Sequence, residues 1–330
     1  MAILPGTEPT AIAQAAQRWA AGGLVAFPTE TVYGLGARAD DDAAVARIFA
    51  AKGRPADHPL IVHLADAAGA DAFSSGLTAA ARRLTEAFWP GPLTVIVPRR
   101  ADRGRAAAGG QDSIGLRVPA HPVALALLRE ALGLGVHGVA GPSANRFGRV
   151  SPTSARHVQQ EFGPALMVVD GGRSAVGIES TIVDCTREVP ALLRPGQLSR
   201  AALEAVLGRP LADPDAASPR ASGTLASHYA PMAPVTLLDD VALRHRWAAG
   251  HPGPGAVVGV YSRLAPGWAS APGSAWACRA MPADAASVAH ELFAVLREFD
   301  EAGVAAIWVE RPPPGPDWDG VRDRLQRAAA

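Results

Sequence analysis

Short apolar runs, each about the length of one strand, recur along the chain and alternate with segments of helical periodicity. Residues 24–27 form the first clear run, and residues 60–64 and 93–97 follow after helix-like stretches. Strands that alternate with helices are typical of α/β domains, in which helices cover an open sheet. The pattern therefore predicts an α/β fold. It also draws attention to polar residues after the strands, because such sheets bind ligands at strand ends.

The same periodicities predict the other elements of the first two thirds of the chain. Helices are expected at residues 10–21 with Thr10 as N-cap, from Asp41 and Asp42 onward, at 77–89, at 122–132, at 153–162 capped by Thr153, and at 199–207 capped by Ser199. Further strands are expected at residues 114–118, 136–140, 166–169, 181–183 and 191–194.

A change of composition divides the chain. Residues 210–234 are rich in Asp-Pro, Ser-Pro and Ser-Gly pairs, which are typical of linkers. Beyond them, strands are expected at 235–238, 256–260 and 305–309, and helices at 285–302 and 315–328. We therefore predict a first domain over 1–209, a linker over 210–234, and a small Rossmann-like α/β domain with a mostly parallel sheet over 235–330.

Composition excludes several classes of protein. The chain has 330 residues, 48% of them hydrophobic, and a net charge of zero, which is unlike a disordered chain or one coated with nucleic acid. No stretch approaches the roughly 18 apolar residues of a membrane span, and residues 1–9 do not resemble a signal peptide. The two cysteines, Cys185 and Cys278, are far apart and form no metal motif, so a reducing cytoplasm is expected.

One basic residue stands out by its rarity. Of the 31 basic residues, Lys52 is the only lysine, and it is followed by Gly53 and Arg54. A lysine offers a compact charge and an arginine a planar fork, and both suit phosphate. A helix end also attracts basic residues for structural reasons, so the segment by itself leaves both interpretations open. Nearby His58 and His63 do not share a helical face, and structural histidines are favoured over a metal pair.

Five further clusters bring together hydroxyl groups, glycines and charged or aromatic polar residues. Thr29-Glu30-Thr31 follows the first strand, although an ordinary turn would also explain it. Ser113 and Arg117 have the same parity, so both can face one side of a strand, where the arginine needs an anionic partner from the protein or a ligand. The remaining clusters are residues 141–145 with Ser151, residues 179–181 with Arg194, and His228-Tyr229 in the linker. Ser143 as a hydrolase nucleophile is disfavoured, because the pattern is not GxSxG.

The order and spacing of these clusters resemble the threonylcarbamoyl-AMP synthase family, in its long form with a YrdC-type domain and a smaller C-terminal domain. The matching stretches are PTETVYGLG at 28–36, KGRP at 52–55 with PLIVHL at 59–64, WPGPLT at 89–94, IGLRVP at 114–119, PSAN at 142–145 with SPT at 151–153, ESTIV at 179–183, LRPG at 193–196 and HYAP at 228–231. In the linker, residues 223–227 depart from a common Gly-Met-Lys-Tyr form of the family.

The resemblance implies a twisted, open mixed sheet with a concave basic cavity. It implies a nucleotidyltransferase that makes L-threonylcarbamoyl-AMP and pyrophosphate from L-threonine, bicarbonate and ATP, with Mg²⁺ held by the ATP phosphates and not by a protein site. The product feeds the threonylcarbamoyladenosine modification of tRNA at position 37, so a tRNA-modifying transferase is the expected partner.

The resemblance also implies the site residues. Threonine is expected at Thr31, His63, Arg117, Gly141 and Ser180. ATP is expected at Arg54, His58, Ser113, Ser143, Ser151, Arg194 and Tyr229. The signature expected to act in catalysis is Lys52, Arg54, Ser143 and Asn145, with Lys52 and Arg54 as counter-charges to phosphate. The linker around His228 and Tyr229 is expected to close over ATP. Lys52→Arg is expected to lose most of the activity while leaving folding intact.

Two alternatives belong to other functional classes. A carbamoyl transferase of the hydrogenase-maturation type shares the YrdC-like domain, but it also carries zinc fingers that two distant cysteines cannot form. An RNA-binding module without catalysis would use a basic cavity, but the three tyrosines and the lack of aromatic–basic interleaving disfavour it. Weak RNA binding alongside catalysis remains compatible with the sequence.

Overall fold

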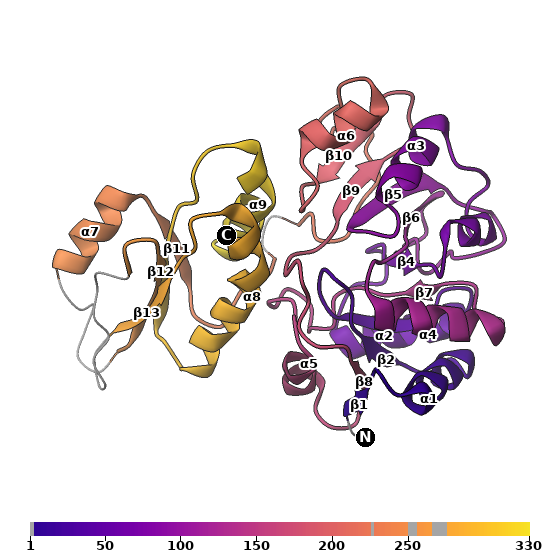
Figure 1. Cartoon of the computed structure of the whole chain (residues 1–330), viewed down its shortest axis with the longest axis horizontal. Helices are drawn as coiled ribbons and strands as arrows, with labels where there is room; N and C mark the ends of the chain where they lie inside the picture. Colours follow the sequence, from indigo (N-terminus) through magenta and orange to yellow (C-terminus); the bar gives the residue numbers. More distant parts are fainter. Residues whose placement is uncertain (1–2, 226–227, 250–255, 266–275) are drawn as a thin grey trace. The chain divides into compact units, whose positions relative to one another are not determined.

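The computed structural model describes residues 3–225, 228–249, 256–265 and 276–330 (Figure 1). The chain forms two compact units. Unit 1 comprises Met1–Phe147 and Ser151–Thr224, and unit 2 comprises Gly148–Val150 and Leu225–Ala330. Residues 210–224 of the expected linker thus belong to unit 1, and residues 225–234 belong to unit 2.

Unit 1 is built on a ten-stranded mixed sheet. In spatial order its strands are β1 (Ile3–Pro5), β8 (Met167–Asp170), β2 (Val25–Phe27), β3 (Gly34–Arg38), β7 (Val139–Ala140), β4 (Ile61–His63), β6 (Ser113–Arg117), β5 (Leu93–Pro98), β9 (Thr181–Asp184) and β10 (Ala191–Arg194). Parallel ladders such as β4–β6 and β5–β9 alternate with antiparallel ladders such as β5–β6 and β9–β10. The mixed open sheet expected from the family resemblance is confirmed.

Two separate cores hold the helices of unit 1 against this sheet. Helices α1 (Pro9–Ala20) and α4 (Pro122–Gly133) share one core through Trp19 and Leu127, together with Val25 and Phe27 of β2. The second core takes Ala26, the intervening residue of β2, because successive strand side chains point to opposite faces. Its helices are α2 (Asp42–Lys52), α3 (Ala79–Phe88), α5 (Ala155–Phe162) and α6 (Arg200–Leu207), and a 3₁₀ helix spans Ala67–Ala72.

The local expectations fail where capping chemistry was misassigned. Helix α1 begins at Pro9 after Glu8, and Thr10 lies inside its first turn, where proline's fixed φ and missing N–H suit the helix start. Helix α5 is capped by Ser154, whose hydroxyl accepts from the amide of His157, and not by Thr153. The sequence analysis also missed β1 and β3, and it extended the two-residue strand β7 to five residues.

Unit 2 contains a four-stranded parallel sheet with the order β11 (Val235–Leu238), β14 (Ala306–Glu310), β12 (Val258–Ser262), β13 (Trp276–Ala280). Figure 1 shows α7 (Asp240–Ala248) on one face of this sheet, and α8 (Ala285–Glu301) and α9 (Asp319–Ala328) on the other. A short 3₁₀ helix, Pro316–Trp318, precedes α9. The parallel sheet confirms the expected small α/β domain, although α7 and β13 were not anticipated.

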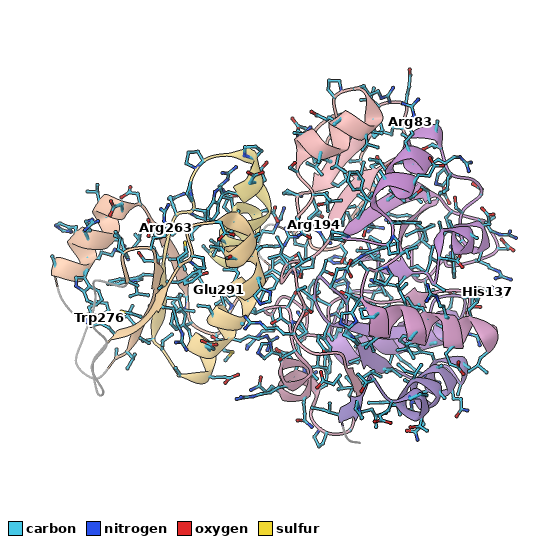
Figure 2. The ribbon with its side chains drawn as sticks, viewed as in Figure 1. Arg83, His137, Arg194, Arg263, Trp276 and Glu291 are labelled. Carbon is cyan, nitrogen blue, oxygen red and sulfur yellow. The ribbon has the colours of Figure 1, made fainter. Side chains whose placement is uncertain are left out.

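Buried polar contacts fix the end of the unit 2 sheet. Glu310, at the end of β14, is 3% exposed and accepts hydrogen bonds of 2.7 Å from the Ser262 hydroxyl and the Arg263 amide. The Arg263 side chain pairs with the same carboxylate, and Figure 2 labels this residue. Because each carboxylate oxygen has a partner, the buried charge is compensated. Among the helices that the structure describes, none is long and apolar enough to cross a membrane.

Candidate functional site in unit 1

One face of the unit 1 sheet carries many of the residues expected to bind substrates. Partner residues across a ladder point to the same face, and so do alternate residues of one strand. From β4 to β10, the ladder partners on this face are His63–Arg117, Ile96–Gly115, Thr94–Ile182 and Ile182–Arg194. Ser113 is four residues before Arg117 in β6, so it shares the face. The pairing between strands thus shows that these residues of five neighbouring strands lie on one face of the sheet.

The polar loop after β2 is a rigid hydroxyl-stabilised turn. The Thr29 hydroxyl accepts from the amides of Thr31 and Val32, both at 3.2 Å, and donates to the Val32 carbonyl at 2.6 Å. The two threonine hydroxyls are 2.9 Å apart, and both residues are buried. A threonine that bonds to backbone groups two and three residues ahead fixes a turn. This explains why hydroxyl residues rather than any polar residues follow β2.

Arg117 connects this loop to the sheet. Its guanidinium donates to the Thr31 hydroxyl at 2.8 Å and to the Gly91 carbonyl at 3.1 Å, and it lies 2.6 Å from a carboxylate oxygen of Glu30. Arg117 is 3% exposed, so its charge requires an anion nearby. The protein supplies that anion through Glu30. The two hydrogen bonds use two of the five N–H groups of the guanidinium. Nη2, the nitrogen that is ion-paired with Glu30, has no hydrogen-bond partner among the described residues, so its N–H groups remain for a ligand.

His63 is buried beside Arg117 and is neutral. Burial lowers its pKa to about 3, and the neighbouring Arg117 charge adds to the effect. Its ring packs edge-on against Phe27 with a centroid separation of 5.4 Å. Nδ1 has no hydrogen-bond partner among the described residues. A Cβ on Gly141 would lie 3.0 Å from this nitrogen, so the glycine allows the backbone to approach the imidazole closely.

Lys52 holds the loop that contains Ser143 and Asn145. It is the last residue of α2, and Gly53 follows in a left-handed conformation with φ of 65°. Its ammonium donates to the carbonyls of Ser143 and Asn145, and the side chain is buried. Burial lowers the pKa of Lys52 well below its usual value, and the charge of Arg54 lowers it further. Lys52 therefore connects the Lys52–Arg54 part of the expected signature to the Ser143–Asn145 part through backbone carbonyls.

Arg54 and His58 meet on one aromatic ring. The Arg54 guanidinium lies over Phe147 at 5.7 Å, and the His58 ring contacts Phe147 edge-on at 5.5 Å. Arg54 also donates to the Pro59 carbonyl at 3.0 Å. Partial burial lowers the pKa of His58, as does the nearby Arg54 charge. Two expected ATP ligands are thus brought together by an aromatic residue that the sequence analysis did not single out.

The two residues before β9, Glu179 and Ser180, contact further residues that are expected to bind substrates. The Ser180 hydroxyl is 2.8 Å from the Thr94 hydroxyl and accepts from Arg194 at 3.2 Å. Arg194, labelled in Figure 2, also donates twice to the Ser180 carbonyl, at 2.9 and 3.1 Å. Beside them, the Ser151 hydroxyl donates to the carboxylate of Glu179. An expected threonine ligand and an expected ATP ligand are therefore in direct contact.

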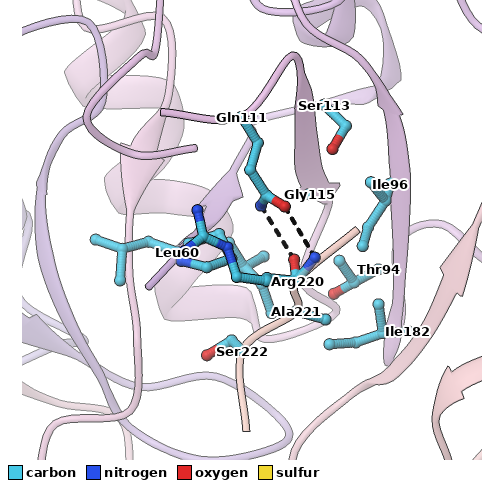
Figure 3. Close-up of a pocket in the computed structure, with 12 residues that line it drawn as sticks. Leu60, Thr94, Ile96, Gln111, Ser113, Gly115, Ile182, Arg220, Ala221 and Ser222 are labelled. Atoms are coloured by element: carbon cyan, nitrogen blue, oxygen red, sulfur yellow. Dashed lines mark hydrogen bonds between the residues drawn. The ribbon is translucent and has the colours of Figure 1, made fainter. Parts of the chain in front are cut away.

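Residues 220–222 cover part of the same sheet face (Figure 3). Arg220 exchanges two hydrogen bonds with the Gln111 side chain, of 2.8 and 3.1 Å. Ser222 accepts from Arg194 through its carbonyl at 2.7 Å and from Arg54 through its hydroxyl at 3.4 Å. The cavity left between this segment and the strands is about 20 Å³, close to the space of one water molecule.

Tyr229, the remaining expected ATP ligand, belongs to unit 2. Its backbone is left-handed with φ of 62°, an unusual conformation for a residue with a side chain. The ring is 1% exposed and packs against His228 at 4.4 Å and Phe293 at 5.4 Å, with the Arg324 guanidinium 5.3 Å from its centre. The motif is therefore ordered, as expected of a segment that does more than connect two domains.

Metal chemistry finds little support in the protein's own side chains. Among the described residues, no group of three His, Cys, Asp or Glu side chains is arranged to hold a metal ion. Neither Cys185 nor Cys278 forms a disulfide.

The chain matches a family model described as telomere recombination over residues 17–196, and a second, described as threonylcarbamoyl-AMP synthase, C-terminal domain, over residues 198–330. It is 38% identical over 332 residues to the threonylcarbamoyl-AMP synthase of Bacillus subtilis, covering 98% of this chain and 94% of that protein. The chain belongs to the threonylcarbamoyl-AMP synthase family. The resemblance of its motifs to this family is thereby confirmed.

Other members of the threonylcarbamoyl-AMP synthase family match different shares of the chain. The Pyrococcus abyssi protein is 44% identical over 224 residues, which is 66% of this chain and 65% of that protein. The putative synthase of Mycobacterium tuberculosis is 39% identical over 189 residues, or 57% of this chain and 85% of that protein. The crystal structure of P. abyssi Sua5 complexed with L-threonine has a TM-score of 0.84 at 36% identity, covering 96% of this chain and 94% of that one.

Sequence reasoning missed residues that complete the site through their partners. Glu30 and Glu179 were quoted within motifs without a role, and the structure shows each buried against an expected ligand, Arg117 and Ser151 respectively. Thr94 was likewise given no role, although it contacts Ser180. An acidic residue next to a strand end is a usable signal, because a carboxylate that becomes buried there needs a partner.

Proposed function

We propose that this chain is a threonylcarbamoyl-AMP synthase that converts L-threonine, bicarbonate and ATP to L-threonylcarbamoyladenylate and pyrophosphate. The observation that carries the proposal is the convergence of the Arg117–Thr31 pair, neutral His63, and the Arg194–Ser180 contact on one sheet face. The product would supply a tRNA-modifying transferase in the cytoplasm. The named relatives support this reading over the carbamoyl transferase alternative.

The proposed chemistry needs positioning more than a protein nucleophile. The threonine amine combines with bicarbonate to give a carbamate and water. A carbamate oxygen then attacks the α-phosphorus of ATP, and pyrophosphate leaves with the electrons of the broken P–O bond. Fixed cations near the phosphates stabilise the charge that develops in such transfers. Arg54 and Arg194 are the cations that we assign to this role.

Lys52 contributes differently from its expected role as a direct counter-charge. Its ammonium donates to two carbonyls of the 143–145 loop, so we propose that it shapes the loop that places Ser143 beside the nucleotide. The positive charge of its ammonium also adds to the electrostatic potential at the phosphates of bound ATP. Mg²⁺ is proposed to enter with the nucleotide, and no step here is assigned to it.

Closure over the nucleotide is proposed for the segment that includes residues 220–222. Ser222 already contacts both Arg54 and Arg194, two expected ATP ligands. Movement of this segment would exchange those contacts for contacts to phosphate and would exclude water from the labile mixed anhydride. Deletion of residues 222–231 is expected to abolish product formation, whereas unchanged turnover and product yield would rule out this closure.

Pyrophosphate release measures the proposed function directly. Release is expected only when ATP, L-threonine and bicarbonate are all present, and chelation of divalent cations is expected to abolish it. L-serine is the matched control, because it lacks only the methyl group. Equal release with L-serine, or release without any amino acid, would contradict the substrate assignment. RNA binding in the absence of ATP, without any pyrophosphate release, would favour the RNA-binding module.

A further inference from the structure

Glu30 presents a buried carboxylate oxygen that the described protein does not satisfy. The residue is 8% exposed, and its Oε1 lies 2.6 Å from the Arg117 guanidinium. Both oxygens are buried without a hydrogen-bond partner among the described residues, and the ion pair recorded with Arg117 is made by Oε1. An ionised carboxylate accepts through both oxygens, and leaving one unmatched in a buried position costs free energy. The geometry thus provides a strong acceptor beside the residues expected to bind threonine.

The backbone that carries this carboxylate is held by hydrogen bonds at Glu30 and at Thr31. The Glu30 carbonyl accepts from the Val176 amide at 2.7 Å, and the Thr31 carbonyl accepts from the Gly177 amide at 3.1 Å. The Thr29 hydroxyl closes the turn that contains Glu30. A binding group held this way loses little conformational entropy when a ligand arrives. Glu30 is therefore a preorganised part of the site, unlike a mobile surface carboxylate.

The expected threonine ligands leave one pole of the amino acid without a charged partner. Arg117 is a cation that suits the α-carboxylate, and Thr31, Gly141, Ser180 and neutral His63 carry no negative charge. An α-ammonium has three donors, and charge-assisted hydrogen bonds to a carboxylate are the strongest partners it can find. Glu30 supplies such a carboxylate next to Arg117. Opposite charges held side by side match the two poles of a zwitterion.

We propose that Glu30 binds the α-ammonium of the amino-acid substrate through Oε2, while Arg117 binds its α-carboxylate. The inference rests on the proposed function and adds the residue that selects an amino acid over the corresponding hydroxy acid. The ion pair with Glu30 keeps Arg117 oriented, and the N–H groups of Arg117 that make no hydrogen bond to the protein take the substrate carboxylate. Glu30 thus contacts the substrate and also positions a second residue that does so.

A cycle of two ligands and two proteins tests this assignment by titration calorimetry. The ligands are L-threonine and the 2,3-dihydroxybutanoate of matching stereochemistry, in which a hydroxyl replaces the ammonium. The wild-type chain is expected to bind L-threonine at least about 10-fold more tightly, the scale of a hydrogen bond between charged groups. Glu30→Gln is expected to weaken L-threonine by about 10- to 100-fold and to leave the hydroxy acid equally or more tightly bound, because Arg117 loses its internal competitor.

Three outcomes would overturn the inference or its basis. An equal loss of affinity for both ligands would mean that Glu30 only maintains the fold of the site. Unchanged L-threonine affinity in Glu30→Gln would mean that the carboxylate does not contact the ammonium. A wild-type chain that does not bind L-threonine would refute the proposed function itself, and the inference with it.

Two further variants keep the test decisive. Glu86→Gln removes the same charge from an exposed position of α3 and is expected to leave both affinities within twofold. Glu30→Asp retains the charge on a shorter side chain and is expected to restore part of the discrimination between the two ligands. If Glu30→Gln does not fold, the comparison rests on Glu30→Asp, and full wild-type discrimination at weakened overall affinity would contradict the proposal.

Discussion

At the scale of single residues, the site depends on charges that the protein has removed from water. Lys52, Arg117 and Arg194 are each 2–3% exposed, and every one of them donates to backbone carbonyls. A buried cation is costly unless such partners are present, so the effect of a substitution depends on the shape of the replacement as well as its charge. The rarity of lysine suggested that Lys52 is special, and its two carbonyl partners give a physical reason.

Lys52→Arg is expected to lower pyrophosphate release at least about 100-fold and the free energy of unfolding by about 1–3 kcal/mol. The compact ammonium sits between two carbonyls of one loop, and a wider guanidinium displaces that loop. The structure thus predicts a loss of stability that the sequence did not. Steady-state assays and urea denaturation measure both effects.

Arg105→Lys is the control for Lys52→Arg, because Arg105 is exposed, and it should change stability by less than about 0.5 kcal/mol. Near-wild-type release by Lys52→Arg would show that the lysine is incidental.

His63 makes stability depend on pH. Its folded pKa of about 3 lies below the value of 6.5 expected for the unfolded chain. Between these values the unfolded state binds a proton that the folded state does not, so acid favours unfolding. The contribution of His63 to the free energy of unfolding is complete above pH 6.5. As the pH drops toward 3, it is expected to fall by up to about 1.4 kcal/mol per pH unit.

His63→Gln is expected to make the dependence of unfolding free energy on pH shallower between pH 6 and 4. Urea denaturation of wild type and variant at several pH values gives the two slopes. Identical slopes would mean that other groups cause the acid sensitivity.

At the scale of elements, the ends of helices and strands determine where the expected site residues lie. Helix α2 begins at Asp42 after its N-cap Asp41, whose carboxylate accepts from the amides of Ala43 and Ala44. It ends at Lys52 with Gly53 as C-cap. The left-handed glycine ends the helix after Lys52 and changes the direction of the chain before Arg54. The sequence predicted the start of this helix correctly, and the structure shows that Lys52 belongs to its last turn.

Gly53→Ala is expected to lower the free energy of unfolding by about 1 kcal/mol, because its φ of 65° disfavours any residue with a Cβ. No atom lies within 4 Å of the added methyl group, so the cost is conformational. Gly133→Ala is the matched control. It has equally open surroundings, lies at the end of α4, and should stabilise by up to about 1 kcal/mol. Equal effects of both changes in chemical denaturation would contradict the argument.

At the scale of the whole molecule, each unit has its own apolar core. One core packs between helices α1 and α4 and the sheet, and a second packs against α2, α3 and α6. Both contain only residues of unit 1. The core around β12 and α7 contains only residues of unit 2. Residues 148–150 are an exception to sequence order. They belong to unit 2, where the Arg297 side chain donates to the Val150 carbonyl and the Ala230 amide donates to the Gly148 carbonyl.

Residues 1–224 are expected to fold alone and to unfold in a single cooperative transition, because their cores need no residue of unit 2. Loss of the partners of residues 148–150 should cost no more than a few kcal/mol. Circular dichroism during thermal and urea unfolding measures this. An aggregated fragment, or one without a cooperative transition, would show that unit 1 requires the rest of the chain.

The sequence by itself determined the class of fold, the family and most of the residues expected at the site. The periods of strands and helices and the sequence of each motif are local properties. They predict structure reliably because each one reflects a single strand, helix or turn. The paired parity of Ser113 and Arg117 is one example, since alternation within a strand already fixes a face.

Only the tertiary structure decided which of those residues meet and what compensates their charges. The contact between Glu30 and Arg117 joins residues 87 positions apart in sequence, and the carbonyl partners of Lys52 lie 91 and 93 residues away. Such pairings depend on strand order and on burial, which local pattern does not encode. A buried charge must find a partner somewhere in the fold, and the position of that partner distinguishes a residue that organises the site from one that remains available to a substrate.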